Sequence, residues 1–244
     1  MPKKQTIVVL DTGDLASRAV ELFKAAAEAS VERTGRFVVA LSGGSTMRGM
    51  HRLLAVPPTL TSVPWVQTHL FWADERCVPA GDCDSNFGTA WKDMLRYLPL
   101  PRDNIHRVRG SLSPEEAAEE YELRLNRFFQ LAVGEYPVFD LVVLGMGKDG
   151  HTASLFPGQR ALYEETRLAV AVKGGSPDVH RVTLTYPVLN QARQIVFLVT
   201  GKEKAETLKR LDSEPELPAA RIKPLRGDVT WLLDQEAASL LSNP

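Results

Sequence analysis

Cysteine is scarce in this sequence, and its two copies suit neither a disulfide framework nor a zinc site. Cys77 and Cys83 are the only cysteines among 244 residues, too few to staple a small secreted fold, and a reducing compartment would keep both as thiols. A site assembled from His69 and the two cysteines would match no zinc-binding spacing, and the five histidines form no H-x3-H pair. The sequence therefore predicts no metal centre.

Long apolar runs and an excess of one charge are also missing. No stretch approaches the roughly 18 apolar residues that would span a membrane, and the apolar run after the start MPKKQ ends before Asp11, too early for a signal peptide. The formal net charge of -1 gives no bulk attraction to nucleic acid or anionic membranes. We therefore expect a cytoplasmic protein that binds a small molecule, with neither nucleic acid nor membrane as a partner.

What the sequence does contain is a globular composition, 44% hydrophobic and 24% charged, with alternating strand and helix patterns. Strands are predicted at 6–10, 37–41, 68–73, 139–144, 168–172, 180–185, 195–199 and 229–233. Helices are predicted at 14–33, 47–54, 87–98, 113–131, from 201 onward and at 235–241. This alternation predicts an α/β fold with a doubly wound, mostly parallel sheet and helices on both faces. We expect residues 1–244 to form one monomeric domain.

The stretch 139–157, FDLVVLGMGKDGHTASLFP, is the most informative part of the chain. Its apolar start is typical of a strand buried on both faces of a parallel sheet. Glycines within 145–150 then permit a tight turn that brings Asp149 and His151 to the carboxyl end of that strand, the edge where open α/β sheets bind ligands. Taken alone, the same residues also fit an ordinary glycine-rich turn with a surface histidine.

A dinucleotide site is a false lead in this stretch. Residues 145–150 spell G-x-G-x-x-G, but that fingerprint needs a continuous helix after the turn and an acidic residue about 20 positions later. Pro157 and Gly158 interrupt such a helix, and the next apolar run ends at Lys173. We therefore expect no bound dinucleotide.

A second informative stretch joins the predicted strand 37–41 to the predicted helix 47–54. The loop between them consists of Ser42, Gly43, Gly44, Ser45 and Thr46. Free N–H groups, the helix dipole and the hydroxyls make such a loop a natural anion site, although it lacks the lysine of a nucleotide-binding P-loop. The alternative is that Ser45 or Thr46 merely caps the helix. The doubled glycine favours close approach of a ligand.

Two further segments carry candidate charges. The predicted strand 68–73 delivers Asp74 and Arg76 at its carboxyl end, where charged residues are often functional, although a solvated loop is the ordinary alternative. Lys204 lies near the start of the helix that opens at Gly201. It could reach an anion there, but most helix lysines face solvent.

Four segments, taken together and in chain order, resemble the 6-phosphogluconolactonase family. They are LSGGST at 41–46, WADER at 72–76 with VP at 78–79 and SN at 85–86, GMGKDGHTASLFP at 145–157, and RVTLTYP at 181–187 with LN at 189–190. The resemblance covers nearly the whole chain. It implies hydrolysis of 6-phosphoglucono-1,5-lactone to 6-phosphogluconate in the oxidative pentose phosphate pathway, without metal or organic cofactor. It also implies a fold shared with glucosamine-6-phosphate deaminase.

The resemblance also implies roles for individual residues. His151 is the expected general base, and Asp149 orients either the turn or the imidazole. The expected phosphate ligands are the loop 42–46 together with Arg181 and Lys204, whereas Asp74, Arg76 and Asn86 are expected to line the sugar end. The oxyanion would meet either Arg76 or backbone N–H groups of the turn that contains Gly147. Two residues depart from the motifs, Met47 and Lys148, and neither touches the expected chemistry.

Residue types agree with this reaction. A lactone is an activated ester that water can attack directly, so one base and an oxyanion partner suffice, and imidazole titrates near neutral pH. A related deaminase and isomerase would carry glutamate where this chain has Phe156. A sugar-phosphate sensor of transcription would need a DNA-binding segment and a basic surface, for which the chain has no spare residues. Both alternatives are therefore disfavoured.

Overall fold

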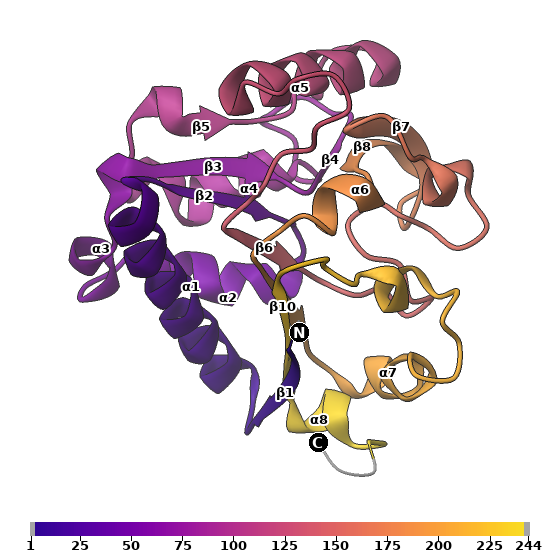
Figure 1. Ribbon diagram of the computed structural model, residues 1–244. Helices are drawn as coiled ribbons and strands as arrows, with labels where there is room; N and C mark the ends of the chain where they lie inside the picture. The colour runs from indigo at the N-terminus through magenta and orange to yellow at the C-terminus, as the bar shows by residue number, and fades with distance from the viewer. Residues whose placement is uncertain (1–2, 242–244) are drawn as a thin grey trace.

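A seven-stranded parallel sheet forms the centre of the computed structural model, which describes residues 3–241 (Figure 1). Every neighbouring pair of strands runs parallel, which confirms the predicted fold class. The order across the sheet is β1 (Lys4–Val9), β10 (Asp228–Asp234), β9 (Gln194–Val199), β6 (Leu141–Leu144), β2 (Phe37–Leu41), β3 (Thr68–Trp72) and β5 (Ile105–His106). All residues of β2 and β6 are buried, because both faces of the sheet are covered.

Helices surround this sheet. They are α1 (Thr12–Thr34), α2 (Ser45–Leu54), α3 (Thr59–Ser62), α4 (Asn86–Asp93), α5 (Pro114–Phe129), α6 (Tyr186–Leu189), α7 (Ala205–Arg210) and α8 (Gln235–Ala238). Short 3-10 turns lie at Trp65–Gln67, Leu95–Tyr97, Arg102–Asn104, Arg160–Tyr163, Lys202–Lys204 and Pro218–Arg221. Figure 1 shows α1 and α2 on one side of the sheet and α5 on the other. Within residues 3–241, no helix is long and apolar enough to cross a membrane.

Helix ends follow the chemistry of their terminal residues. The side chain of Asp11 accepts the backbone N–H groups of Gly13 and Asp14 at the start of α1, and Gly35 ends this helix with a φ of 76°. Ser113 and Glu116 form a reciprocal capping box at the start of α5. The predicted helix 87–98 is instead interrupted after α4, because the backbone at Met94 leaves the helical region.

One part of the predicted sheet is wrong. The predicted strands 168–172 and 180–185 belong to a separate antiparallel sheet of β4 (Asp74–Arg76), β8 (Val179–Leu184) and β7 (Ala169–Gly174). Only four residues, 175–178, connect β7 to β8, and so short a connection can join only antiparallel strands. This small sheet projects beyond the carboxyl edge of β3, because β4 follows β3 after the single residue Ala73.

Candidate active site

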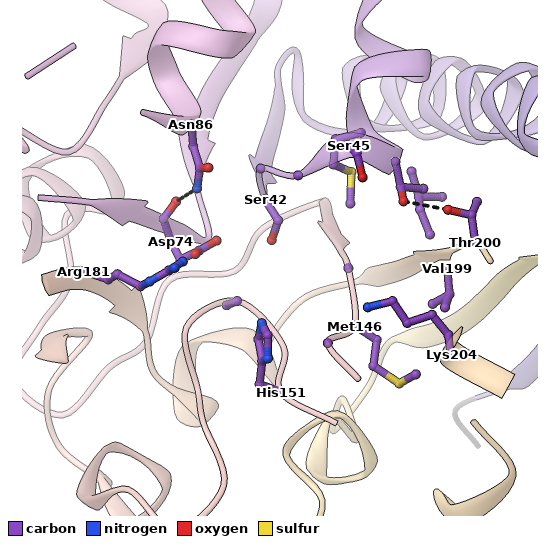
Figure 2. Close-up of a pocket in the computed structure, with 18 of the residues that line it drawn as sticks. Ser42, Ser45, Asp74, Asn86, Met146, His151, Arg181, Val199, Thr200 and Lys204 are labelled. Atoms are coloured by element: carbon purple, nitrogen blue, oxygen red, sulfur yellow. Dashed lines mark hydrogen bonds between the residues drawn. The ribbon is translucent and has the colours of Figure 1, made fainter. Parts of the chain in front are cut away.

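A cleft of about 260 Å³ lies at the carboxyl edge of the parallel sheet, where β2, β6 and β9 end and the small sheet begins (Figure 2). Its lining residues are Ser42, Gly43, Gly44, Ser45, Thr46, Met47, Asp74, Arg76, Asn86, Gly145, Met146, Gly147, His151, Ala153, Arg181, Leu198, Val199, Thr200, Glu203 and Lys204. All but one of the residues singled out from the sequence are in this set. The exception, Asp149, contacts the cleft through His151.

The loop at residues 42–46 leads into the N-terminus of α2. Gly44 is the N-cap, with a φ of 108°, and among the described residues no side chain caps the helix. Ser45 and Thr46 are therefore the first helical residues, and the capping role considered for them is not what they perform. The first N–H groups and the positive end of the dipole of α2 thus remain available to an anion.

Two hydroxyls of this loop differ in their contacts. Thr46 Oγ1 lies 2.9 Å from Thr200 Oγ1, which joins α2 to the end of β9. Ser42 is 5% exposed, and its Oγ has no hydrogen-bond partner within residues 3–241. A buried hydroxyl without a partner is costly, so the Oγ of Ser42 is a ready donor or acceptor for a ligand.

Gly43 permits a close contact between this loop and α4. A Cβ at Gly43 would lie 1.8 Å from Oδ1 of Asn86, so no larger residue fits while Asn86 keeps its place. The amide of Asn86 donates from Nδ2 to the backbone oxygen of Asp74 at 2.8 Å. Asn86 thereby connects the small sheet to the loop at residues 42–46.

Charged side chains from β4 and β8 form one end of the cleft. Asp74 is buried, and its Oδ2 accepts a 2.7 Å hydrogen bond from Ser154 Oγ. Arg76 and Arg181 are direct partners in the antiparallel pair; Arg76 donates to the backbone oxygen of Asp84 and Arg181 to that of Gly174. Burial, and then the charge of Arg76, lower the pKa of Arg181 below its usual value.

His151 is oriented by the turn that follows β6. Its Nδ1 lies 2.5 Å from Oδ1 of Asp149, and its backbone oxygen accepts the N–H of Gly147 at 2.8 Å. A Cβ at Gly147 would lie 2.1 Å from Nδ1 of His151, so glycine is required there. Partial burial favours a neutral Asp149, but the hydrogen bond and charge of His151 outweigh burial and lower the pKa of this carboxyl.

Phe156 packs between two polar groups of the site. Its ring centroid is 4.7 Å from that of His151, and the guanidinium carbon of Arg181 lies 5.6 Å from it on the ring face. Phe156 is 5% exposed, so the contact excludes water from one face of the imidazole. The turn also holds Ala153 at a φ of 48°, an uncommon backbone state that is typical of functional sites.

Lys204 lies across the cleft from Arg181. Figure 2 shows Arg181 beside Asp74 on one side, Lys204 near Met146 and Thr200 on the other, and His151 between them. Burial lowers the pKa of Lys204, against the opposing charge of Glu203. The cleft therefore presents positive charge from two directions, and the two predicted cationic phosphate ligands are not adjacent.

One group of possible metal ligands occurs within residues 3–241, and it is not the combination of His69, Cys77 and Cys83. Asp82, Cys83 and Asp84 bring three ligand atoms within 4.8 Å of one another, outside the cleft lining. His69 instead lies next to His106, with Nδ1 and Nε2 3.3 Å apart.

Several supporting residues were not predicted from the sequence. Thr200 and Ser154 bond to predicted site residues, and Met146 lines the cleft. The position of Thr200 could have been predicted, because it directly follows an apolar strand as Ser42 does. The role of Ser154 could not have been predicted, since its partner Asp74 is 80 positions away in the sequence.

The fold and the cleft together define a class: an α/β protein with a glycine-containing loop at a helix N-terminus and a carboxylate-bound histidine, both at the carboxyl edge of a parallel sheet. Residues 10–231 match the family model described as glucosamine-6-phosphate isomerases/6-phosphogluconolactonase, and the chain belongs to this family.

Individual relatives agree with this assignment. A 6-phosphogluconolactonase of Rattus norvegicus is 43% identical over 86% of this chain and 82% of its own length. One from a Nostoc species is 39% identical over 98% of this chain and 99% of its own. The solved 6-phosphogluconolactonase of Trypanosoma brucei has a TM-score of 0.89 at 30% identity, covering 99% and 100% of the two chains. A monomeric glucosamine-6-phosphate deaminase, with a TM-score of 0.81 at 20% identity, shares the fold.

Proposed function

We propose that this protein is an enzyme that hydrolyses 6-phosphoglucono-1,5-lactone to 6-phosphogluconate, with His151 as the general base. The observation that carries the proposal is the hydrogen bond between His151 and Asp149 beside a cleft whose loop at residues 42–46 leads into a helix N-terminus that no described side chain caps. The relatives named 6-phosphogluconolactonase, which match most of the chain at 38% to 43% identity, support this substrate.

The chemistry starts from the tautomer of His151. Asp149 is a hydrogen-bond acceptor when ionised, so Nδ1 of His151 carries the proton and Nε2 offers a lone pair to water. Water attacks the lactone carbonyl carbon while Nε2 takes one of its protons, which gives a tetrahedral oxyanion. The carbon bond to the ring oxygen then breaks, and His151 returns the proton to that oxygen. Arg76 or the N–H groups of the turn at 145–147 would stabilise the oxyanion.

The phosphate would occupy the loop at residues 42–46. A dianion leaving water needs several charge-assisted donors, and this loop offers helix N–H groups and the unpaired hydroxyl of Ser42. Lys204 and Arg181 supply positive charge from opposite sides of the cleft. In this arrangement Asp74 and Asn86 line the sugar end.

Deamination of an amino sugar phosphate is the nearest competing activity. The apolar ring of Phe156 lies against His151 at 4.7 Å, where a carboxylate could have assisted a second proton transfer. An apolar contact favours one proton transfer from water and disfavours a proton shuttle along an opened sugar.

One assay separates the two activities. The purified protein is supplied with 6-phosphogluconolactone and, separately, with glucosamine 6-phosphate, and the spontaneous hydrolysis rate of the lactone is subtracted. We expect catalysed turnover of the lactone alone. Release of ammonia from glucosamine 6-phosphate without lactone turnover would contradict the proposal.

A further inference from the structure

Glu75 is a buried carboxylate that lies outside the cleft lining and has no role in the chemistry above. It is 2% exposed. Its Oε1 accepts the backbone N–H groups of Arg76 and Asn86, and its Oε2 accepts that of Phe87, each at 2.7 Å. Ser85 adds a 3.2 Å contact from its Oγ to Oε2. Four donors therefore converge on one side chain.

These donors belong to two elements that carry cleft residues. Arg76 is on β4, whereas Asn86 and Phe87 open α4. The Oγ of Ser85, the N-cap, accepts the next N–H, that of Gly88, at 2.9 Å. Glu75 thus satisfies the first N–H groups of α4, which have no partners within the helix, and fastens this helix end to β4.

The attachment reaches the cleft through Asn86. The Asn86 side chain donates to Asp74 and fills the space beside Gly43, where a Cβ would lie 1.8 Å away. The backbone of Asn86 is itself held by Glu75. If Glu75 moved, the backbone of Asn86 would lose its partner, and Asn86 in turn contacts the loop at Gly43.

We propose that Glu75 is a positioning residue, which holds Asn86 against Asp74 and the loop at Gly43 so that the cleft is preformed before substrate arrives. The inference rests on the proposed lactonase function for its kinetic consequence. The structural result, a displaced Asn86 in the Glu75 variant, can be observed directly and does not depend on that function.

The test compares Glu75→Gln, Asn86→Ala and the double variant. Glutamine keeps the size of Glu75 but places an amide donor where two N–H or O–H donors now converge. Assayed at about pH 8, above the raised pKa of about 7 at which Glu75 ionises, the loss of a hydrogen bond to this charged group should lower kcat/KM by about ten- to a hundredfold. If Glu75 acts through Asn86, the double variant should be no worse than Asn86→Ala alone. Losses that multiply, or wild-type kcat/KM in folded Glu75→Gln, would overturn the proposal.

Asp140→Asn is the matched control. Asp140 is also a buried carboxylate that accepts a backbone N–H, that of Val38 at 2.9 Å, but it directly precedes β6 at the amino edge of the sheet, away from the cleft. This variant should lower the melting temperature and leave kcat/KM within about twofold of the wild type. If Asp140→Asn instead lost as much kcat/KM as Glu75→Gln does, the effect of Glu75→Gln would be a result of general destabilisation.

Two further measurements keep the test decisive. If Glu75→Gln does not fold, Glu75→Asp retains the carboxylate on a shorter stem and should show a smaller loss with the same dependence on Asn86. A crystal structure of the folded variant that retains the Asn86 contact to Asp74 would overturn the proposal without any assay. Wild-type protein without lactone turnover would instead refute the proposed function.

Discussion

At the scale of single residues, the imidazole of His151 is held from three directions. Asp149 bonds to Nδ1, Phe156 packs against the ring, and the backbone of Gly147 approaches so closely that no Cβ fits. Such confinement fixes both the tautomer and the direction in which Nε2 faces. A base held in this way needs little rearrangement when substrate binds.

His151→Ala should lower kcat by about 10²–10⁴-fold, the usual contribution of a general base. KM should change little, because the proposed phosphate contacts involve other residues, and the fold should survive, because the side chain is partly exposed. Near-wild-type turnover in a variant with an unchanged circular dichroism spectrum would make Asp74 the next base to test.

Asp149→Asn should reduce kcat less than His151→Ala does, by about ten- to a hundredfold. The amide keeps the size of Asp149 but not the charge that holds the proton on Nδ1. Steady-state kinetics of the double variant provide the check. Its kcat should equal that of His151→Ala, because Asp149 acts through the histidine, and an additional loss would assign Asp149 an independent role.

Arg181→Ala and Lys204→Ala should separate the two sides of the cleft. Loss of a contact to a charged group costs about 1.5–3 kcal/mol, and for the phosphate this appears as a raised KM. The variants are compared on the lactone with and without its phosphate. A phosphate ligand should lose discrimination between the two substrates, whereas a variant that keeps full discrimination identifies a residue that contacts only the sugar.

Residues were predictable where their partners are near in sequence or where a strand end marks them. Asp149 and His151 are two positions apart, and Ser42, Asp74 and Gly145 all follow buried strands. The contacts of Glu75 were not predicted, since a carboxylate in a charged segment reads as solvated until its long-range donors are known.

At the scale of elements, the cleft depends on how closely α4 and the loop before α2 approach each other. Gly43→Ala should disrupt this approach, because the new Cβ would overlap the Asn86 amide. Moving that amide breaks its hydrogen bond to Asp74, so kcat/KM should fall by about tenfold or more. Gly81→Ala is the control, since a Cβ there meets nothing within 4 Å. Equal activity of both variants would contradict the packing role given to Gly43.

The parallel strands were predictable because burial on both faces leaves unbroken apolar runs, as in β2 and β6. The direction in which β7 and β8 pair is not encoded in such runs. The short connection at 175–178 was the available signal, and it was outweighed by the regular alternation elsewhere in the chain. The strand β5 has two residues, too few to give any period.

At the scale of the whole molecule, the ionisation of Glu75 should make stability depend on pH on the acidic side of neutrality. Burial raises its pKa to about 7, against the opposing N–H hydrogen bonds. The folded state then binds more protons than the unfolded state between about pH 4.5 and 7, so the free energy of unfolding falls as pH rises through this window. The loss is roughly 3 kcal/mol at most. Denaturant titrations should show a flatter pH dependence for Glu75→Gln, and identical slopes would contradict the raised pKa.

The pairing of Arg76 with Arg181 across β4 and β8 should make the stability of the protein depend on which anions its buffer contains. Two like charges sit opposite each other, one of them buried, so any multivalent anion that enters relieves repulsion which the unfolded chain does not feel. Linkage then requires phosphate or sulfate to raise the melting temperature more than chloride does at equal ionic strength. Thermal-shift screening against a panel of anions would thus rank ligands of the cleft before any substrate is synthesised.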